Sequence, residues 1–296
     1  MSISSIIVTY QPNVELLSNL ILGNISVFNK VILIDNGSNN IKSIRDAFKH
    51  NDKIFILALF ENVGIAAAQN IGIKSLDIDD ELIVFFDQDS SVDQLFIKAI
   101  ESEYKIIEKK YTQGVILGPM FFHRTEKFEY PIIKFNKYGF RKKLYVSDYE
   151  NVVEASCIIS SGMCVRKDVL TKVGEMDSSL FIDYVDTEWC LRAISKGVRI
   201  FSSPALVMEH EIGDDNIKFF RWRIPVHSSF RRYYRIRNSF ILFKYPHVPL
   251  IVCLRELIFS VAHQFLLIIL TKNKKDYIKS LYRAVRDGLI SLFKKR

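Results

Sequence analysis

The sequence predicts an α/β fold, in which a mostly parallel central sheet is flanked by helices and followed by a C-terminal helical appendage. Short apolar runs alternate with amphipathic stretches of helical length through the first 118 residues. Polar and turn-forming residues end the apolar runs, as they do at the ends of strands. With 296 residues, 49% of them hydrophobic and 25% charged, the chain can bury a large core.

The first 118 residues alternate strand and helix. Strands are expected over 4–10, 31–34, 54–57, 82–86 and 115–119, which are rich in β-branched and aromatic residues. Helices are expected between them, over 14–25, 41–48, 65–75 and 92–110. This alternation favours a parallel sheet, which binds ligands beyond the carboxyl ends of its strands.

Residues 119–216 follow a less regular pattern. Residues 121–150 mix aromatic and charged types without a clear period, which indicates an insertion. An apolar strand pair or bend is expected over 157–165, a short helix over 169–173, a helix over 183–196 and a strand over 198–201. We therefore expect one domain over 1–216, with halves of about 1–118 and 119–216.

The segment 217–296 differs in charge from the rest of the chain. It holds 18 Lys and Arg against 3 Asp and Glu, a net charge of +15, whereas residues 1–216 carry −7. Arg and aromatic residues interleave over 219–237, and helices are expected over 248–270 and 277–293. Charged and polar residues interrupt the first of these helices, so a core-packing or interfacial helix is expected rather than a membrane-spanning one. Such a basic segment suits an anionic partner, either nucleic acid or anionic lipid.

The four cysteines show no C-x-x-C pair and lie in apolar surroundings. This pattern favours free thiols in a reducing compartment, and hence the cytoplasm.

Two acids end the strand expected over 82–86, in the sequence Asp87-Gln88-Asp89. Carboxylates this close repel each other unless a positive charge neutralises them. Mg²⁺ or Mn²⁺ binds through one or two carboxylates and completes its shell with phosphate and water. A solvated turn is the alternative for an isolated pair of this kind. Because Tyr10 and Asp35 also follow strands, we expect them to share one crevice with Asp87.

A second acidic group comprises Asp183, Asp186 and Glu188. If the helix covers 183–196, the spacing places Asp183 and Asp186 on one helix face. The alternative is a helix N-terminus whose dipole favours acids, which explains one acid more easily than three.

Five segments, taken in order, resemble family 2 inverting glycosyltransferases of the GT-A fold. They are SSIIVTYQP, VILIDNGSNN, NVGIAAAQNIGI, FFDQDS and SSGMCVRKDVLTKVGEMDSSLFIDYVDTEWCLRAISKGVRI. The resemblance covers about residues 3–212. It implies a nucleotide-binding first half, an acceptor-binding second half and a divalent cation, Mg²⁺ or Mn²⁺.

The resemblance also implies roles for individual residues. The nucleotide sugar would be bound by Thr9, Tyr10, Asp35, Asn36, Gly64, Asn70, Asp87 and Gln88. The metal ligands would be Asp89 first, then Asp87 and His210. Asp186 would be the general base, with Asp183, Glu188, Trp189 and Arg192 on the acceptor side. Many relatives carry a Glu-Asp pair here, whereas Val185 precedes Asp186 in this chain. Trp189 can alternatively belong to the core, and Arg192 can pair with the neighbouring acids.

The segments FFDQDS and FIDYVDTEW are most similar to the corresponding segments of bacterial rhamnosyltransferases. Those enzymes use dTDP-L-rhamnose to build O-antigen or other cell-surface polysaccharide. This similarity implies a saccharide or lipid-linked saccharide acceptor. With the basic segment 217–296, it also implies peripheral attachment to the anionic inner face of the cell membrane. Another donor, such as a UDP-hexose, is the alternative within the family.

A basic nucleic-acid-binding protein is the alternative from another class, although it leaves the acids of residues 1–216 unexplained. We therefore expect no nucleic-acid partner. An oxidoreductase is excluded because no G-x-G-x-x-G follows the first strand. The sequence leaves the oligomeric state open.

Overall fold

The computed structural model describes residues 1–123, 127–209, 215–219 and 222–294. Its largest sheet has nine strands in the order β3-β2-β1-β4-β10-β5-β11-β9, and β6 pairs with β5 outside this path. The first four strands of that path run parallel. They are β1 (Ile3–Thr9), β2 (Lys30–Asp35), β3 (Ile54–Ala58) and β4 (Leu82–Asp87). The predicted parallel sheet is therefore confirmed for this half of the chain.

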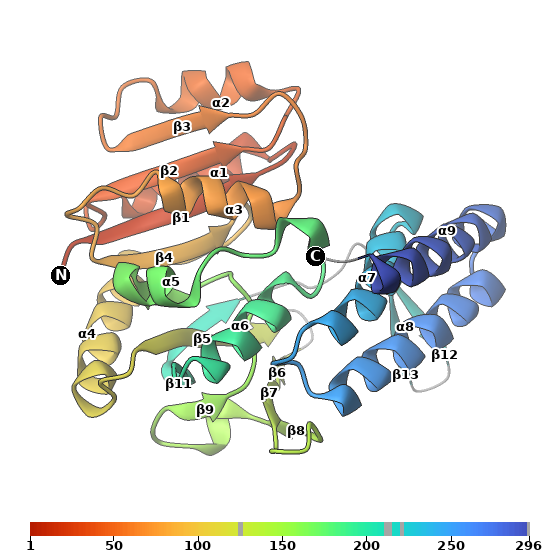
Figure 1. The fold of residues 1–296 in the computed structure, drawn as a ribbon. Helices are drawn as coiled ribbons and strands as arrows, with labels where there is room; N and C mark the ends of the chain where they lie inside the picture. The colour runs from red at the N-terminus through yellow and green to blue at the C-terminus, as the bar shows by residue number, and fades with distance from the viewer. Residues whose placement is uncertain (124–126, 210–214, 220–221, 295–296) are drawn as a thin grey trace.

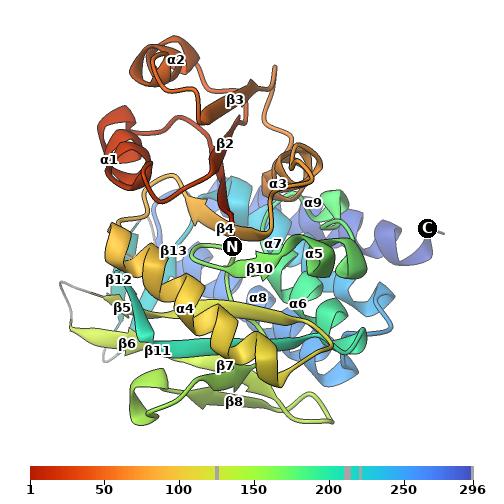
Figure 2. The same cartoon turned by 90° about the vertical axis from the view of Figure 1, so that its left-hand side faces the viewer.

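Helices cover both faces of this sheet. On one face pack α1 (Val14–Asn24), α2 (Ile41–Phe48) and α4 (Gln94–Lys110), and on the other α3 (Ile65–Lys74), α5 (Lys167–Val173) and α6 (Val185–Ser195). Figure 2 shows the two layers. Alternation along the strands explains the division, because Ile7 and Leu33 join the core under α1 whereas Ile6 and Ile34 join the core under α3.

The second half adds antiparallel strands to the sheet. β10 (Cys164–Arg166) lies antiparallel between β4 and β5 (Val115–His123), and β11 (Arg199–Glu209) runs parallel to β5. β9 (Val153–Ala155) pairs antiparallel with β11. The sequence predicts a strand pair or bend over 157–165. In the structure, only the last two of these residues belong to a strand. The others form irregular chain and a turn that hydrogen-bonds to Phe85.

The expected insertion forms a short strand and a hairpin. They comprise β6 (Phe128–Tyr130), β7 (Ile132–Phe135) and β8 (Arg141–Leu144). Short 3-10 turns follow over Val146–Asp148, Ser178–Leu180 and Leu242–Lys244.

The C-terminal segment begins with a β-ribbon and continues as three helices. They are β12 (Asp215–Phe219), β13 (Trp222–Val226), α7 (Ser229–Ile241), α8 (Leu250–Leu270) and α9 (Lys274–Phe293). The three helices lie together on one side of the α/β part (Figure 1). Arg232 of α7 is 1% exposed, and its guanidinium donates to the Gln264 side chain at 2.9 Å and to the Ser260 carbonyl at 2.6 Å. A buried arginine therefore ties α7 to α8.

The start of this helical segment shares the core of the α/β part. Ile241, Tyr245 and Val252 belong to the same buried cluster as Ile6 of β1 and Trp189 of α6. The division at residue 216 stays a prediction, but removal of the helices would expose part of the main core.

Candidate active site

The ends of β1, β2 and β4 meet at one edge of the sheet. Thr9 lies opposite Asp35 in the register, and Val8 lies opposite Asp87. Because these strands are parallel, their carboxyl ends share this edge. The structure thus brings Tyr10, Asp35 and Asp87 to the same edge of the sheet, as the topology predicts.

Asp35 is fixed at the floor of this edge. It is 1% exposed, and its carboxylate accepts from the Thr9 hydroxyl at 3.2 Å and from the Ser38 backbone N–H at 3.0 Å. Tyr10 is the opposite case, since 48% of it is exposed. The Gln88 side chain accepts from the Tyr10 N–H at 2.7 Å and donates to its carbonyl at 3.3 Å. Gln88 therefore joins the β1 end to the acidic turn and leaves the Tyr10 ring open to a ligand.

Two predicted nucleotide residues serve mainly to hold loops together. Asn36 is 3% exposed, donates to the Asn62 side chain at 2.9 Å and accepts from the Val63 N–H at 2.9 Å. Asn70 is also 3% exposed, and its amide pairs with the Met176 backbone in both directions at 2.8 Å. Both polar atoms of the Asn70 side chain bind the chain before α6, so its contact with the nucleotide sugar stays a prediction.

Gly64 allows the donor side to approach the acidic loop. Its φ is +86°, and a Cβ there would lie 2.6 Å from the Phe181 carbonyl oxygen. The neighbouring Ile65 N–H donates to that carbonyl at 2.8 Å. The close backbone approach predicted for this glycine is made to Phe181.

The Asp87-Gln88-Asp89 turn presents carboxylates of different exposure. Asp87 is partly exposed at the end of β4, and Asp89 is exposed in the turn. The Ser161 hydroxyl lies 3.4 Å from the Asp87 N–H and 3.0 Å from the Ser90 hydroxyl, so a second loop braces the turn.

A divalent cation fits the donor atoms of this turn. Hard carboxylate oxygens from Asp87 and Asp89 suit Mg²⁺ or Mn²⁺. Within the described ranges, no three His, Cys, Asp or Glu side chains converge on one metal position. A diphosphate and water would have to supply the remaining ligands. His210, the third predicted ligand, lies outside the described residues.

The acidic loop before α6 has an unusual backbone. Phe181, Asp183 and Tyr184 all have positive φ, at 64°, 63° and 63°. The Asn238 amide of α7 lies within 3.0 Å of the carbonyls of Leu180, Ile182 and Asp183. Such conformations are costly for side-chain-bearing residues and persist where surrounding contacts enforce them. α7 therefore holds this loop in place.

Asp183 does not belong to α6, which begins at Val185. The expectation that Asp183 and Asp186 share a helix face is therefore wrong. The Asp183 side chain is 4% exposed, and its carboxylate accepts from Arg231 at 3.4 Å and from Arg235 at 3.3 Å. Two arginines of the basic segment thus neutralise this acid.

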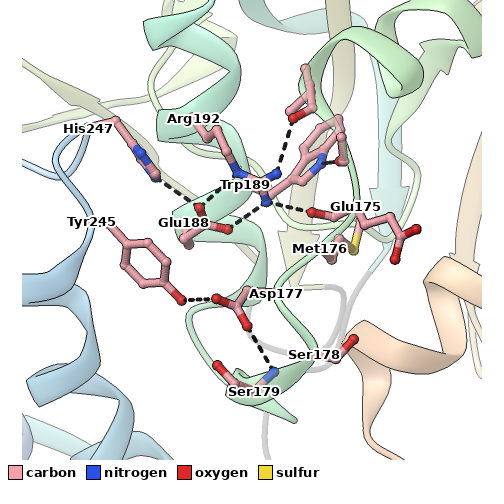
Figure 3. A network of polar contacts seen from close by, with 12 residues as sticks. Glu175, Met176, Asp177, Ser178, Ser179, Glu188, Trp189, Arg192, Tyr245 and His247 are labelled. Atoms are coloured by element: carbon pink, nitrogen blue, oxygen red, sulfur yellow. Dashed lines mark hydrogen bonds and ion pairs between the residues drawn. The ribbon is translucent and has the colours of Figure 1, made fainter. Parts of the chain in front are cut away.

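Glu188 is likewise held by cationic partners (Figure 3). It is 1% exposed, and its carboxylate contacts Arg192 at 2.9 Å and the His247 ring nitrogen at 2.9 Å. Burial raises the pKa of Glu188, but His247 and Arg192 outweigh this effect and place it below its usual value. Arg192 thus takes the predicted alternative of pairing with an acid of its own helix.

Trp189 lies in the core, with 1% exposure, and its indole N–H donates to the Gly174 carbonyl at 2.9 Å. The core alternative describes this residue, and an acceptor sugar has no access to its ring.

Asp186 has the electrostatics of a general base. Burial and the charge of Asp87 raise the pKa of Asp186 to about 7, against opposing hydrogen bonds from Ser160. A carboxyl with this pKa exchanges protons readily near neutral pH. Ser160 hydrogen-bonds to Asp186 and the adjacent Ser161 contacts Asp87, so one short loop links the β4 turn to the start of α6.

The arrangement gives three chemical roles to three different groups of residues. The ends of β1 and β2 can bind a nucleoside, the Asp87-Gln88-Asp89 turn can bind a diphosphate through a cation, and Asp186 can take a proton from a hydroxyl. Ser160, Ser161 and Asn62 were not identified from the sequence. Ser160 contacts Asp186, Ser161 contacts Asp87, and Asn62 contacts Asn36. The paired serines of SSGM were the available signal.

Comparisons with known proteins agree with this geometry. The chain matches the model of glycosyl transferase family 2 over residues 4–173. It is 41% identical over 289 residues, 97% of this chain and 95% of the relative, to the dTDP-rhamnosyl transferase RfbF of Shigella flexneri.

Solved structures share the fold at low sequence identity. GalNAc-T7, crystallised with UDP, GalNAc and Mn²⁺, superposes with a TM-score of 0.58 and 12% identity over 96% of this chain. TarS 1–349 of S. aureus with UDP-GlcNAc gives a TM-score of 0.53 and 12% identity over 99% of this chain and 82% of its own. The chain spans 57% of the length of the GalNAc-T7 chain. The family match, together with the near full-length relative, establishes that this chain belongs to glycosyltransferase family 2.

Proposed function

We propose that this glycosyltransferase transfers L-rhamnose from dTDP-L-rhamnose, with inversion and with the aid of a divalent cation, to a saccharide acceptor in surface polysaccharide synthesis. The observation that supports the chemistry is that neighbouring serines contact both acids: Ser161 hydrogen-bonds to Asp87 in the acidic turn, and Ser160 hydrogen-bonds to Asp186. The donor follows from the 41% identity to a dTDP-rhamnosyl transferase over almost the whole chain.

The mechanism assigns a single displacement to these residues. The nucleotide lies against Tyr10 and Asp35, which orient it at the sheet edge. A bound cation would act as a Lewis acid on the departing diphosphate. Asp186 accepts the proton of the attacking hydroxyl while the acceptor oxygen bonds to the anomeric carbon and the bond to the diphosphate breaks. Asp183, in the loop before α6, and Glu188, within α6, each pair with arginine and hold the helix start on which Asp186 lies.

Donor preference tests this proposal directly. We expect dTDP-L-rhamnose to bind at least about ten-fold more tightly than UDP-glucose, since a tenfold ratio needs only about 1.4 kcal/mol of additional contacts. Isothermal titration with each nucleotide sugar, with and without Mg²⁺ or Mn²⁺, measures the difference. Tighter binding of the UDP-hexose would replace the rhamnose assignment with the family alternative.

We also propose that the helical C-terminal segment binds the anionic inner face of the cell membrane, where a lipid-linked acceptor would lie. α8 exposes an apolar stripe that consists of Leu250, Leu254, Ile258, Phe265 and Ile269. The loop after α8 and the helix α9 then add several lysines and arginines to the same segment. An apolar helix face with basic neighbours is typical of interfacial binding.

α8 is also, among the described helices, the one with the length and apolar composition of a membrane-crossing helix. Its inner face carries Ser260 and Gln264, which bind the buried Arg232 of α7. These polar contacts favour a helix that lies on the bilayer, packed against α7 and α9.

Vesicle flotation tests the membrane proposal. Replacing both Ile258 and Phe265 with glutamate should weaken binding to vesicles containing phosphatidylglycerol by about ten-fold or more, because burial of one such side chain contributes about 1.5–3 kcal/mol. Ile78→Glu is the control, since this residue is 91% exposed and lies outside the C-terminal helices. Equal flotation of the double variant and the control would contradict the proposal.

A further inference from the structure

A pocket of about 210 Å³ lies between the insertion hairpin and the C-terminal helices. Its lining comes from several elements and includes Arg141, Cys157, Tyr184, Thr187, Arg235 and Glu256. Tyr184 and Thr187 flank Asp186 in the sequence. Burial is the main cause of the raised pKa of the Cys157 thiol, and the charge of Asp186 adds to it. The pocket therefore lies beside Asp186.

The charged residues that line the pocket are Arg141, Arg235 and Glu256. Arg235 contacts Asp183 at 3.3 Å and Glu256 at 3.8 Å, and Arg255 pairs with Glu256. The Tyr184 hydroxyl donates to Glu256 at 3.0 Å. Arg231 and Arg255 lie beyond the pocket wall and pair with the same two acids as Arg235, namely Asp183 and Glu256. Among the described residues, these ion pairs involve Arg231, Arg235 and Arg255 and not Arg141.

Arg141 is the arginine best placed to receive a ligand. It is exposed on β8 and lines the pocket together with Arg235 of α7. Partial desolvation at the pocket, followed by the charge of Arg255, lowers the pKa of this otherwise exposed side chain, although Glu256 acts against this. An anion in the pocket would relieve the repulsion among these arginines.

We propose that this pocket binds an anionic group of the acceptor, a phosphate or a carboxylate, and that Arg141 is the residue that recognises it. The inference rests on the proposed function, because Asp186 must deprotonate a hydroxyl of the molecule held there. A guanidinium offers two parallel N–H donors, which match the paired oxygens of phosphate and carboxylate. Thr187, which also lines the pocket, supplies a hydroxyl for the neutral part of the same ligand.

The anion has two chemical sources that an experiment can separate. A lipid-linked saccharide carries a diphosphate, and an acidic sugar carries a carboxylate. The probes are farnesyl diphosphate with farnesol as its neutral counterpart, and hexyl glucuronide with hexyl glucoside. Each probe is titrated into the full chain with Mg²⁺ and saturating dTDP. The donor site is then already occupied by dTDP and cannot bind the phosphate of the probe.

We expect one anionic probe to bind more tightly than its neutral counterpart, and Arg141→Gln to weaken that binding about ten-fold, as loss of a charge-assisted hydrogen bond does. Lys142→Gln is the matched control, because it removes the same charge from the next residue of β8, whose side chain points to the opposite face. Arg141→Lys should recover part of the affinity.

Two results would overturn the inference: neither anionic probe binds better than its counterpart, or Arg141→Gln and Lys142→Gln weaken binding equally. The proposed function is judged separately, by titration of dTDP alone. If dTDP binds but the anions do not, the pocket inference fails and the donor site stands. If dTDP does not bind and Arg141→Gln still weakens anion binding, the pocket stands and the donor assignment fails.

Discussion

Replacing Asp186 with asparagine is expected to lower the rate of sugar transfer by about 10²–10⁴-fold, the usual contribution of a general base. Donor binding should stay close to that of the unchanged protein, because the nucleotide contacts lie on β1 and β2. Asparagine keeps the shape of the side chain but cannot accept the proton of the attacking hydroxyl. Single-turnover transfer and calorimetric titration of the donor separate the two effects.

The same substitution should stabilise the protein, which excludes misfolding as the cause of lost activity. The pKa of Asp186 rises from its usual 3.8 to about 7 on folding, so the folded state favours the protonated form. The contribution of protonated Asp186 to the free energy of unfolding is fully present below about pH 4 and is lost as the pH rises through about 7. Asp186→Asn should therefore gain on the order of 1 kcal/mol over the unchanged protein at pH 8 and nothing at pH 4.

Glu188→Gln provides the contrast to Asp186→Asn. Glu188 is 1% exposed and paired with Arg192, so its neutralisation leaves the largely buried Arg192 guanidinium without its counter-charge. Loss of one partner from a buried pair costs about 3–5 kcal/mol. Thermal denaturation should show opposite shifts for the two variants. Greater loss of transfer in a fully folded Glu188→Gln protein would assign the base to Glu188 instead.

Replacing Asp89 with alanine is expected to reduce metal-dependent donor turnover by about 100-fold or more, since a cation contributes several kcal/mol to stabilising a developing charge. Asp89 is exposed, so its removal should leave the thermal midpoint within the range of ordinary surface substitutions. Titration of Mn²⁺ in the presence of dTDP should show weaker metal binding as well.

Asp46→Ala is the control for this experiment. Asp46 is an exposed aspartate on α2, and its removal changes the net charge equally without touching the crevice. If Asp89→Ala retains full activity at low Mn²⁺ concentration, the metal assignment to the Asp87-Gln88-Asp89 turn is wrong.

The strand ends were predictable because their cause is local. The alternation of apolar runs with helical stretches sets the parallel topology, and parallel topology places the residues after each strand at one edge. Tyr10, Asp35 and Asp87 therefore follow strands that end at one edge of the sheet, as expected. Asp186 could be singled out only through the resemblance to a family, since the sequence does not show which of three neighbouring acids keeps its proton near neutral pH.

The contacts between distant segments were not predictable from local patterns. Asn70 binds Met176 across 106 residues, and Glu188 binds His247 across 59. The helical spacing predicts Asp183 to lie in the same helix as Asp186. It lies before the helix, because the Asn238 side chain binds the carbonyls of residues 182 and 183. The net charge of +15 likewise overstates the basic surface, since Arg231, Arg232 and Arg235 bind groups within the protein.

The central claim is that the acids after β4 and at the start of α6 share one site with a cation and a diphosphate. A crystal structure with dTDP and Mn²⁺ tests it most directly, because the anomalous signal of manganese locates the metal. The account predicts a peak within coordination distance of Asp89 or Asp87 and of the diphosphate, with the Asp186 carboxylate facing the same cavity. A peak bound elsewhere, or a diphosphate away from the β4 turn, would contradict it.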